Sequence, residues 1–376
     1  MNKSRRMLCG WGVAALVLVP LGSTVKARAA DLGPDPKEIQ AVFDKAAAYL
    51  KKKQAPDGSF PVKGAGPGVT ALVVAAQLRN GVSADDPVVA KAIAALEKSV
   101  QKDGGIYDKG LANYTTSVAL MAFVEANKGG KYDTLIKNAT KFIRGMQQVE
   151  SGDKDVKFGG VGYDDKSRPD LSNTQLWVDA LIAAGVPKDD PALQKALIFI
   201  SRCQNLPGEK NDQPFATKTT EDDKGGLTYS PIDPDKSNYK TADGGLRSLG
   251  GMTYAGLKSF LYAGVSKEDK RVEAALNWVR KHYTLDENPG MGQAGLYYYY
   301  HTFGKAMDAL GEDNFADADG KKHDWRKELF EALKKRQQAD GSWVNEKDKQ
   351  FGEASPELAT AFAMLTLSYC QPPKKK

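Results

Sequence analysis

One short phrase recurs along this chain and limits its fold more than any other feature. Each copy runs from a helix-forming segment through a glutamine and a turn with glycine and an aromatic residue to a second helix-forming segment. Three copies have the form Gln-x-x-x-Gly-x-aromatic, and their residues are Gln54, Gly58 and Phe60, then Gln101, Gly105 and Tyr107, then Gln337, Gly341 and Trp343. Gln54, Gln101 and Gln148 follow one another at intervals of 47 residues, which is the length of a helical-hairpin repeat.

Three looser copies complete the set. Two carry insertions, from Gln148 to Tyr163 and from Gln204 to Tyr229, and a degenerate copy joins His282 to Tyr297. Together the six units fill residues 30–371, before a basic tail at 372–376. The sequence therefore predicts one large repeat domain.

The two helix-forming segments of a unit differ in pattern. Asp35, Pro36 and Glu38 form a helix start ahead of apolar residues that recur at helical spacing on one side. Residues 69–78 and 360–367 are instead apolar on nearly every side, so helices there must be buried all round. We expect an all-α fold, an α/α toroid of about six helical hairpins with an inner and an outer ring of helices, in which the last hairpin packs on the first.

The second segments also share a common register. A threonine lies 11 residues before a glycine or asparagine helix terminator in four units, at Thr70, Thr116, Thr174 and Thr253, and Tyr300 and Thr360 hold the equivalent place in the last two. We call this place the register position. We expect the threonine hydroxyl to satisfy a free amide in the first turn of its own helix.

The phrase at Gln337, Gly341 and Trp343, with its relatives at Gln54 and Gln101, resembles the QW motif of squalene and oxidosqualene cyclases, which protein prenyltransferase β subunits share more loosely. The repeat covers essentially all of the chain after residue 29. The resemblance implies the same toroid. It also implies a structural role for the motif, in which the glutamine caps a neighbouring helix and the aromatic ring packs on the turn.

The sequence motifs that carry the chemistry of these families are absent from this chain. No Asp-x-Asp-Asp acid motif of a class II cyclase is present, and the nearest strings, at Asp233–Asp235 and Asp317–Gly320, lie in polar segments that we expect to be solvated loops. Neither Cys203 nor Cys370 follows an aspartate by two residues, as prenyltransferase zinc binding requires, and the Cys-Gly-Glu-Gln string of thioester toroids is absent. We predict no metal and no cofactor, and we assign no catalytic residue.

Residues near the register position are the candidates for lining a cavity at the mouth of the ring. They are Asn173, Gln175, Tyr254, Tyr300, His301 and Glu357. The run of four tyrosines that ends at Tyr300 favours structural packing over cation stabilisation, because four consecutive rings cannot share one helix face. Asp179, Lys258 and Lys305 share a place five residues after the register position, where they form a buried ion pair or bind an anionic head group if they face inward. Outward placement against the outer helices is equally open.

The N-terminus has the order of a secretory signal: basic residues, an apolar stretch from Leu8 to Leu21, and Ala27-Arg28-Ala29. We expect cleavage after Ala29 and export to the periplasm or outside the cell, with a twin-arginine route open through Arg5–Arg6. Five of the 53 basic residues and none of the 47 acidic ones lie in this segment, so the net charge falls from +6 to about +1 without it. This balance gives no case for nucleic-acid binding.

Two cysteines remain after residue 29, Cys203 and Cys370, and we expect two separate buried thiols there. No later segment is long and apolar enough to span a membrane, although peripheral contact stays open.

Three functions remain open. The first is binding of an apolar or isoprenoid-like ligand in the central cavity, with or without turnover. The second is a protein-interaction scaffold that uses the long insertions between Gln148 and Tyr163 and between Gln204 and Gly250 as its binding face. The third is a polysaccharide-acting hydrolase or lyase, for which the available carboxylates are Asp170, Asp179, Glu353 and Glu357.

Overall fold

A computed structural model describes residues 32–208, 210–348 and 350–372 of the chain. The predicted signal segment and the basic tail from Lys374 onward lie outside these residues. The described residues form twelve α-helices, three 3₁₀ turns and one short antiparallel hairpin of β1 (Phe315–Ala316) and β2 (Lys322–His323). No helix among them is long and apolar enough to cross a membrane.

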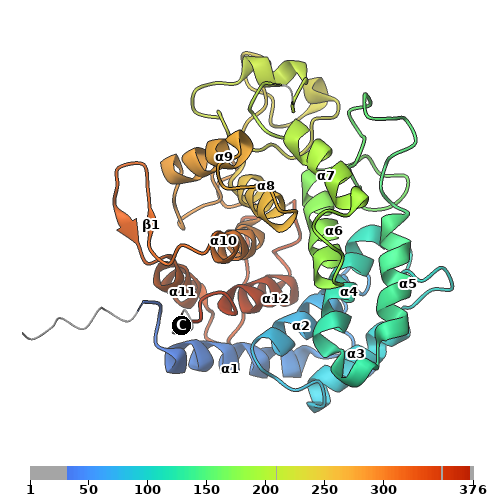
Figure 1. Cartoon of the computed structure of the whole chain (residues 1–376). Coiled ribbons are helices and arrows are strands. Elements are labelled where there is room, and N and C mark those ends of the chain that lie inside the picture. The colour runs from blue at the N-terminus through green and yellow to red at the C-terminus, as the bar shows by residue number, and fades with distance from the viewer. Residues whose placement is uncertain (1–31, 209, 349, 373–376) are drawn as a thin grey trace, which may run out of the picture. The chain divides into compact units, whose positions relative to one another are not determined.

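The helices form two concentric rings, as predicted (Figure 1). The outer helices are α1 (Pro36–Lys53), α3 (Pro87–Glu97), α5 (Asp133–Arg144), α7 (Pro191–Arg202), α9 (Lys270–Lys281) and α11 (Trp325–Arg336). The inner helices are α2 (Gly68–Arg79), α4 (Ala112–Ala126), α6 (Leu171–Ala183), α8 (Gly250–Tyr262), α10 (Leu296–Leu310) and α12 (Pro356–Leu367). Each inner helix packs on the next, and α12 packs on both α2 and α1, so the ring closes. The all-α toroid is therefore confirmed.

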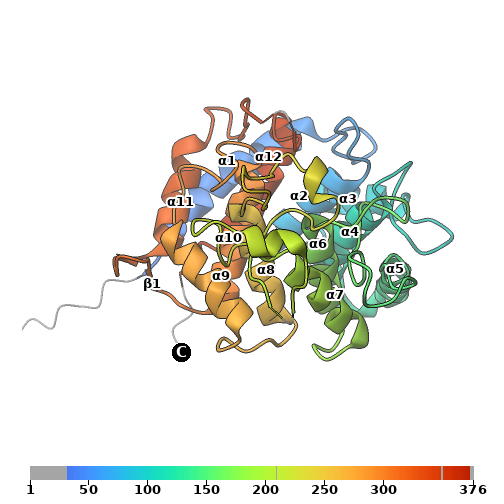
Figure 2. The same cartoon turned by 90° about the horizontal axis from the view of Figure 1, so that it is seen from above.

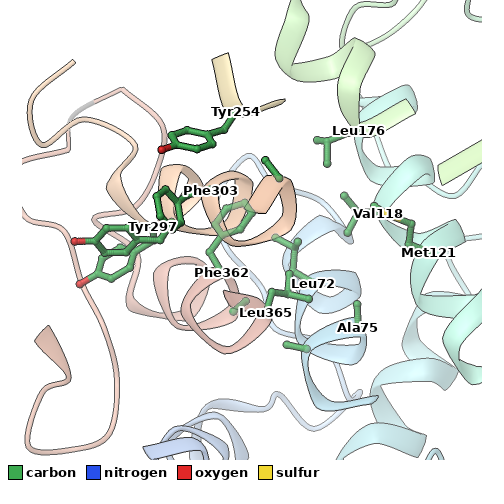
Figure 3. Close-up of a cluster of buried hydrophobic side chains, with 14 of the residues drawn as sticks. Leu72, Ala75, Val118, Met121, Leu176, Tyr254, Tyr297, Phe303, Phe362 and Leu365 are labelled. Atoms are coloured by element: carbon green, nitrogen blue, oxygen red, sulfur yellow. The ribbon is translucent and has the colours of Figure 1, made fainter. Parts of the chain in front are cut away.

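The inner helices are buried on almost every side because other helices surround them. All residues from Gly68 to Gln77 of α2 are buried, whereas α1 buries only the stripe from Ile39 to Leu50 that faces the ring. Figure 3 shows Leu72, Val118 and Leu176, from α2, α4 and α6, facing one another across the ring interior. Tyr297 of α10 points away from them.

The threonines of the register position tie each inner helix to the turn before it. Thr70 accepts a hydrogen bond from the Phe60 amide at 3.0 Å, and Thr360 accepts one from the Trp343 amide at 3.0 Å. Thr116, Thr174 and Thr253 do the same for Ile106, Val161 and Leu227. The prediction that these hydroxyls cap their own helix is therefore wrong, because the amide belongs to the preceding turn.

A glutamine braces the same turn against the next outer helix in four of the six units. The Gln54 side-chain amide donates to the Gly58 carbonyl at 3.0 Å and to the Val88 carbonyl of α3 at 2.8 Å. Gln204, Gln337 and, in the third unit, Gln147 make the equivalent pair of bonds. The brace of the third unit is therefore one residue before the predicted Gln148. Glycine is required in this turn because Gly58 has a φ of 92° and a Cβ there would lie 2.2 Å from the Lys91 carbonyl oxygen.

The second unit departs from the predicted register by one residue. Its turn glycine is Gly104, with a φ of 91°, and Ile106 takes the buried aromatic place in that turn. Val100 therefore occupies the brace position, while the exposed Gln101 amide bonds only to nearby carbonyls, those of Ser99 and Tyr107. The paired glycines Gly104 and Gly105 explain why the sequence phrase matched one residue late.

Cys203 and Cys370 are free and buried, as expected. Asp233 and Asp235 lie exposed, and Asp317 begins the turn that joins β1 to β2.

Candidate functional site

The six inner helices all begin at the same end of the ring, because each follows its outer helix in a hairpin (Figures 1 and 2). There, successive units are joined by hydrogen bonds from the first turn of one inner helix to the turn of the next unit. The Asn113 amide donates to the Tyr163 carbonyl at 2.9 Å, and the Leu171 amide donates to the Tyr229 carbonyl at 2.8 Å. The Tyr298 amide donates to Glu353 at 2.8 Å. First-turn amides that a helix cannot satisfy itself thus fix the turns around a common centre.

This mouth encloses a pocket of about 370 Å³ to which all six units contribute. Most of its lining side chains are aromatic or aliphatic, namely Val62, Val69, Leu111, Tyr114, Tyr163, Tyr229, Met252, Met291, Tyr298, Phe351, Leu358 and Phe362. The polar or charged side chains on the wall are Lys63, Ser172, Asn288, Gln350 and Glu353. The volume lies within the range of small-molecule sites.

Two of the polar groups form a hydroxyl pair on the wall. The Ser172 and Tyr298 hydroxyl oxygens are 3.0 Å apart, and the Tyr298 oxygen accepts a second hydrogen bond from the Gln175 side-chain amide at 3.0 Å. The Tyr298 ring is fixed from the side by the Phe362 ring, which it meets at 87° with the centroids 5.7 Å apart.

Glu353 is the one carboxyl group among the residues that line the pocket. Its oxygens accept from the Tyr298 amide at 2.8 Å and from the Asn345 side-chain amide at 2.9 Å. Burial raises the pKa of Glu353 to about 7, because these hydrogen bonds favour the charged form but do not offset the loss of solvent. Glu353 is therefore poised to exchange a proton near neutral pH.

A buried charge cluster lies behind the hydroxyl pair, reached through Gln175. Lys258 donates to Gln175 and, at 2.6 Å, to one Asp179 oxygen, while Lys305 donates to the other at 2.7 Å. Burial opposes the charge of Asp179, but the two lysines outweigh it and hold its pKa below the ordinary value. Burial lowers the pKa of Lys258 to about 7, an effect that Asp179 offsets only in part. The structure thus places these three residues inward, where they form ion pairs with one another.

None of the six predicted cavity residues lines the pocket. Gln175 lies behind the wall as described, and Asn173 is buried, with its amide donating to Asp170, which caps α6. Glu357 accepts from Tyr49 and Ser355.

The remaining three candidates belong to the packing between helices. Tyr254 packs against the rings of Tyr299 and Phe303, and Tyr300 donates to the Leu285 carbonyl at 2.5 Å. His301 lies between the rings of Phe362 and Tyr369, and burial together with Lys305 depresses its pKa well below the ordinary value.

The pocket uses a different place in the same register. The residues two positions before the register position include Tyr114, Ser172, Gly251, Tyr298 and Leu358, all of which line the pocket. They lie closer to the helix start, and the pocket sits beyond the helix starts, so the sequence interpretation was about one helical turn too deep. Tyr163 and Tyr229 were visible in the sequence as the aromatic residues of the two inserted copies. For Glu353 the only signal in the sequence was that it is one of four available carboxylates.

The sequence matches no family model and no curated protein. Among solved structures, the chain is similar to the type II terpene cyclase MstE from Scytonema, at 14% identity and a TM-score of 0.53 over 89% of this chain and 98% of that one. It is also similar to a polysaccharide lyase, at 9% identity and a TM-score of 0.55 over 89% and 96%, and to a family 88 glycosyl hydrolase from Bacteroides vulgatus, at 10% and 0.53 over 89% and 97%. These likenesses define the class as an α/α toroid and, at such identities, show the fold alone. Membership of the QW-repeat family stays a prediction.

Proposed function

We propose that this protein binds a small apolar, isoprenoid-like molecule in the pocket at the mouth of the ring. The observation that carries the proposal is the pocket itself, a cavity of about 370 Å³ whose wall is mainly tyrosine, phenylalanine, methionine and aliphatic side chains from all six units. Sites for small apolar ligands have this composition, with few polar groups that fix orientation. The likeness to a terpene cyclase is consistent with such a ligand.

The carboxyl groups favour this function over hydrolysis of a polysaccharide in the same pocket. An acid–base pair needs two carboxyl groups across the substrate. Only Glu353 is on the wall, since Asp170 is occupied as a helix cap, Asp179 by two lysines and Glu357 by Tyr49 and Ser355.

Extraction of the purified protein with organic solvent, followed by mass spectrometry, tests the proposal. We expect a compound that is enriched in the wild type and lost in Gly251→Leu, because Gly251 lines the pocket and a Cβ there meets no atom closer than 3.7 Å, so the added side chain occupies the cavity. Gly110→Leu is the matched control, since a Cβ there meets no atom within 4 Å and Gly110 lies outside this pocket. Background lipid alone in the wild type, with no binding of added isoprenoids, contradicts the proposal.

A second candidate function is binding of a polar ligand at the rim. The insertion after α7 borders a groove of about 770 Å³ whose wall includes Asp222, Thr241, Arg247 and Glu287. Such a wall suits a saccharide better than a hydrocarbon, and the lyase and hydrolase likenesses are as strong as that to the cyclase. The same insertion forms part of the binding face in the protein-interaction scaffold hypothesis.

Oligosaccharide binding, measured by calorimetry, tests this second candidate. The double variant Asp222→Asn/Glu287→Gln should lose affinity about tenfold, since two carboxylates can no longer accept from sugar hydroxyls. Asp235→Asn changes a carboxylate of the same insertion outside the groove and should have no effect. Absence of saccharide binding in the wild type removes the candidate.

We also propose that the chain is exported, from the order of residues 1–29. N-terminal sequencing of the protein from a periplasmic or culture fraction should begin at Ala30. Recovery of the uncleaved chain from the cytoplasm contradicts export.

A further inference from the structure

The hydroxyl pair on the pocket wall has one more proton to donate than it has acceptors among the described residues. Ser172 and Tyr298 each carry one hydroxyl proton, and the contact between their oxygens uses one of the two. The other contact, from the Gln175 amide to the Tyr298 oxygen, brings a proton and takes none away. Among the described residues neither hydroxyl has a further acceptor, so one proton of the pair is left for a bound molecule.

The buried charge cluster decides this polarity. Lys258 contacts the Asp179 carboxylate at 2.6 Å, and in its protonated form it has donors only. The Gln175 atom that faces the protonated lysine must then be the carbonyl oxygen, and the amide nitrogen must face Tyr298. Lys258 is itself held by Asp179 at 2.6 Å, and its side chain is 1% exposed. Reversal of the Gln175 amide would set its nitrogen against the lysine nitrogen.

We propose, on the basis of the proposed function, that the pocket selects apolar molecules that carry an oxygen acceptor, such as an ether, carbonyl or hydroxyl oxygen. That oxygen accepts a hydrogen bond from the spare hydroxyl proton of the Ser172–Tyr298 pair. Gln175, oriented by Lys258, is the positioning residue: it presents a donor and no acceptor to the pair, so the spare proton stays available to the pocket. A hydrocarbon of the same shape leaves this proton unpaired in an apolar cavity, which costs binding free energy.

Three probes that share the C15 farnesyl skeleton separate the possibilities: farnesyl methyl ether, which only accepts, farnesol, which accepts and donates, and farnesene, which does neither. Equilibrium dialysis of the full protein should give dissociation constants for the ether and the alcohol about tenfold below that for farnesene. The double variant Ser172→Ala/Tyr298→Phe should bind all three alike. Each single variant should keep the preference, because either hydroxyl supplies a proton once its neighbour is gone.

Tyr114→Phe is the matched control, since it removes a phenol from the same pocket without touching the pair. It should keep the preference for the ether over farnesene. If it abolishes that preference, Tyr114 is the donor and the inference is wrong.

Two substitutions of Gln175 test its positioning role. In Gln175→Glu the carboxylate faces both Lys258 and Tyr298, so Tyr298 must donate to it and Ser172 must donate to Tyr298, and no proton remains for the ligand. Affinity for the ether should fall about tenfold while farnesol, which can donate to the pair, keeps its affinity. In Gln175→Met the pair keeps its spare proton and the ether keeps its advantage. A merely structural role for Gln175 predicts the same loss in both variants, and that result overturns the inference.

The two proposals fail in different ways. Equal binding of all three probes by the wild type overturns the inference and leaves the apolar ligand in place. Binding of none of them by the wild type contradicts the proposed function, and the inference falls with it.

Discussion

The side-chain amide of Gln337 donates a hydrogen bond of 2.9 Å to the carbonyl oxygen of Val42, which lies 295 residues earlier in the chain. The same amide donates to the Gly341 carbonyl at 3.0 Å. One side chain thus joins the last turn of the repeat to the first outer helix and helps to close the ring.

Gln337→Leu should lower the free energy of unfolding by ~1–3 kcal/mol, because two part-buried hydrogen bonds are lost and the Gly341 carbonyl is left without its donor. Urea unfolding followed by circular dichroism measures the change. Gln101→Leu is the control, because Gln101 is exposed and bonds only to carbonyls within six residues of it, and it should shift stability by less than ~0.5 kcal/mol. Equal effects of the two variants would contradict the bracing role.

Val100→Gln should stabilise the protein by ~0.5–1.5 kcal/mol, since the second unit lacks the brace that four others have. The Gly104 turn approaches Asn138 of α5 as the Gly58 turn approaches Lys91 of α3, so the Leu135 carbonyl stands where Gln54 finds that of Val88. A rise in the thermal midpoint checks this. Val100→Leu, which adds apolar surface without a donor, should give no such rise.

Thr360→Val should destabilise the fold by ~1–3 kcal/mol, because the buried Trp343 amide loses its acceptor and the shape of the side chain is unchanged. Thr366→Val removes an equally buried hydroxyl that bonds only to the Phe362 carbonyl of its own helix and should cost less. Thr360→Ser should restore most of the stability. Chemical denaturation of the three variants distinguishes a turn-holding hydroxyl from a simple packing position.

Asp179→Asn should cost ~3–5 kcal/mol, because Lys258 and Lys305 are left buried around a neutral side chain. The triple variant Asp179→Leu/Lys258→Met/Lys305→Met should be less destabilised than the single one, since no charge remains to be buried. Unfolding free energies at pH 7 measure both. A triple variant that is less stable than Asp179→Asn would show that the cluster stabilises the ring beyond mutual neutralisation of its charges.

Glu353 should make the protein less stable as the pH rises from about 4.5 to about 7. Its folded pKa of about 7 lies above the ordinary value of 4.5, so the unfolded chain releases its proton first as the pH rises. This release stabilises the unfolded state relative to the folded state by up to ~3 kcal/mol over this window. Glu353→Gln removes the titration. We expect its unfolding free energy to change less with pH than that of the wild type, and parallel profiles would contradict a raised pKa.

The sequence by itself determined the repeat, the pairing of helices and the closed ring. The reason is physical: helices such as α2 and α12 carry apolar residues on all sides, and only burial within a ring of other helices satisfies that pattern. The glycines of the turns were also visible, because the close approach of another backbone excludes a side chain there.

Only the tertiary structure decided which residues meet in the pocket. The mouth is built where the starts of six helices converge, so a shift of one turn along a helix separates Tyr298 on the wall from His301 between the helices. Sequence periodicity gives the face and the register of a helix but not its depth along the axis of the ring. Glu353 reaches the wall through a loop held by Asp348 and Asn345, whose hydrogen bonds no repeat pattern encodes. The same holds for the link from Tyr298 through Gln175 to Lys258, which joins three helices that are distant in the chain.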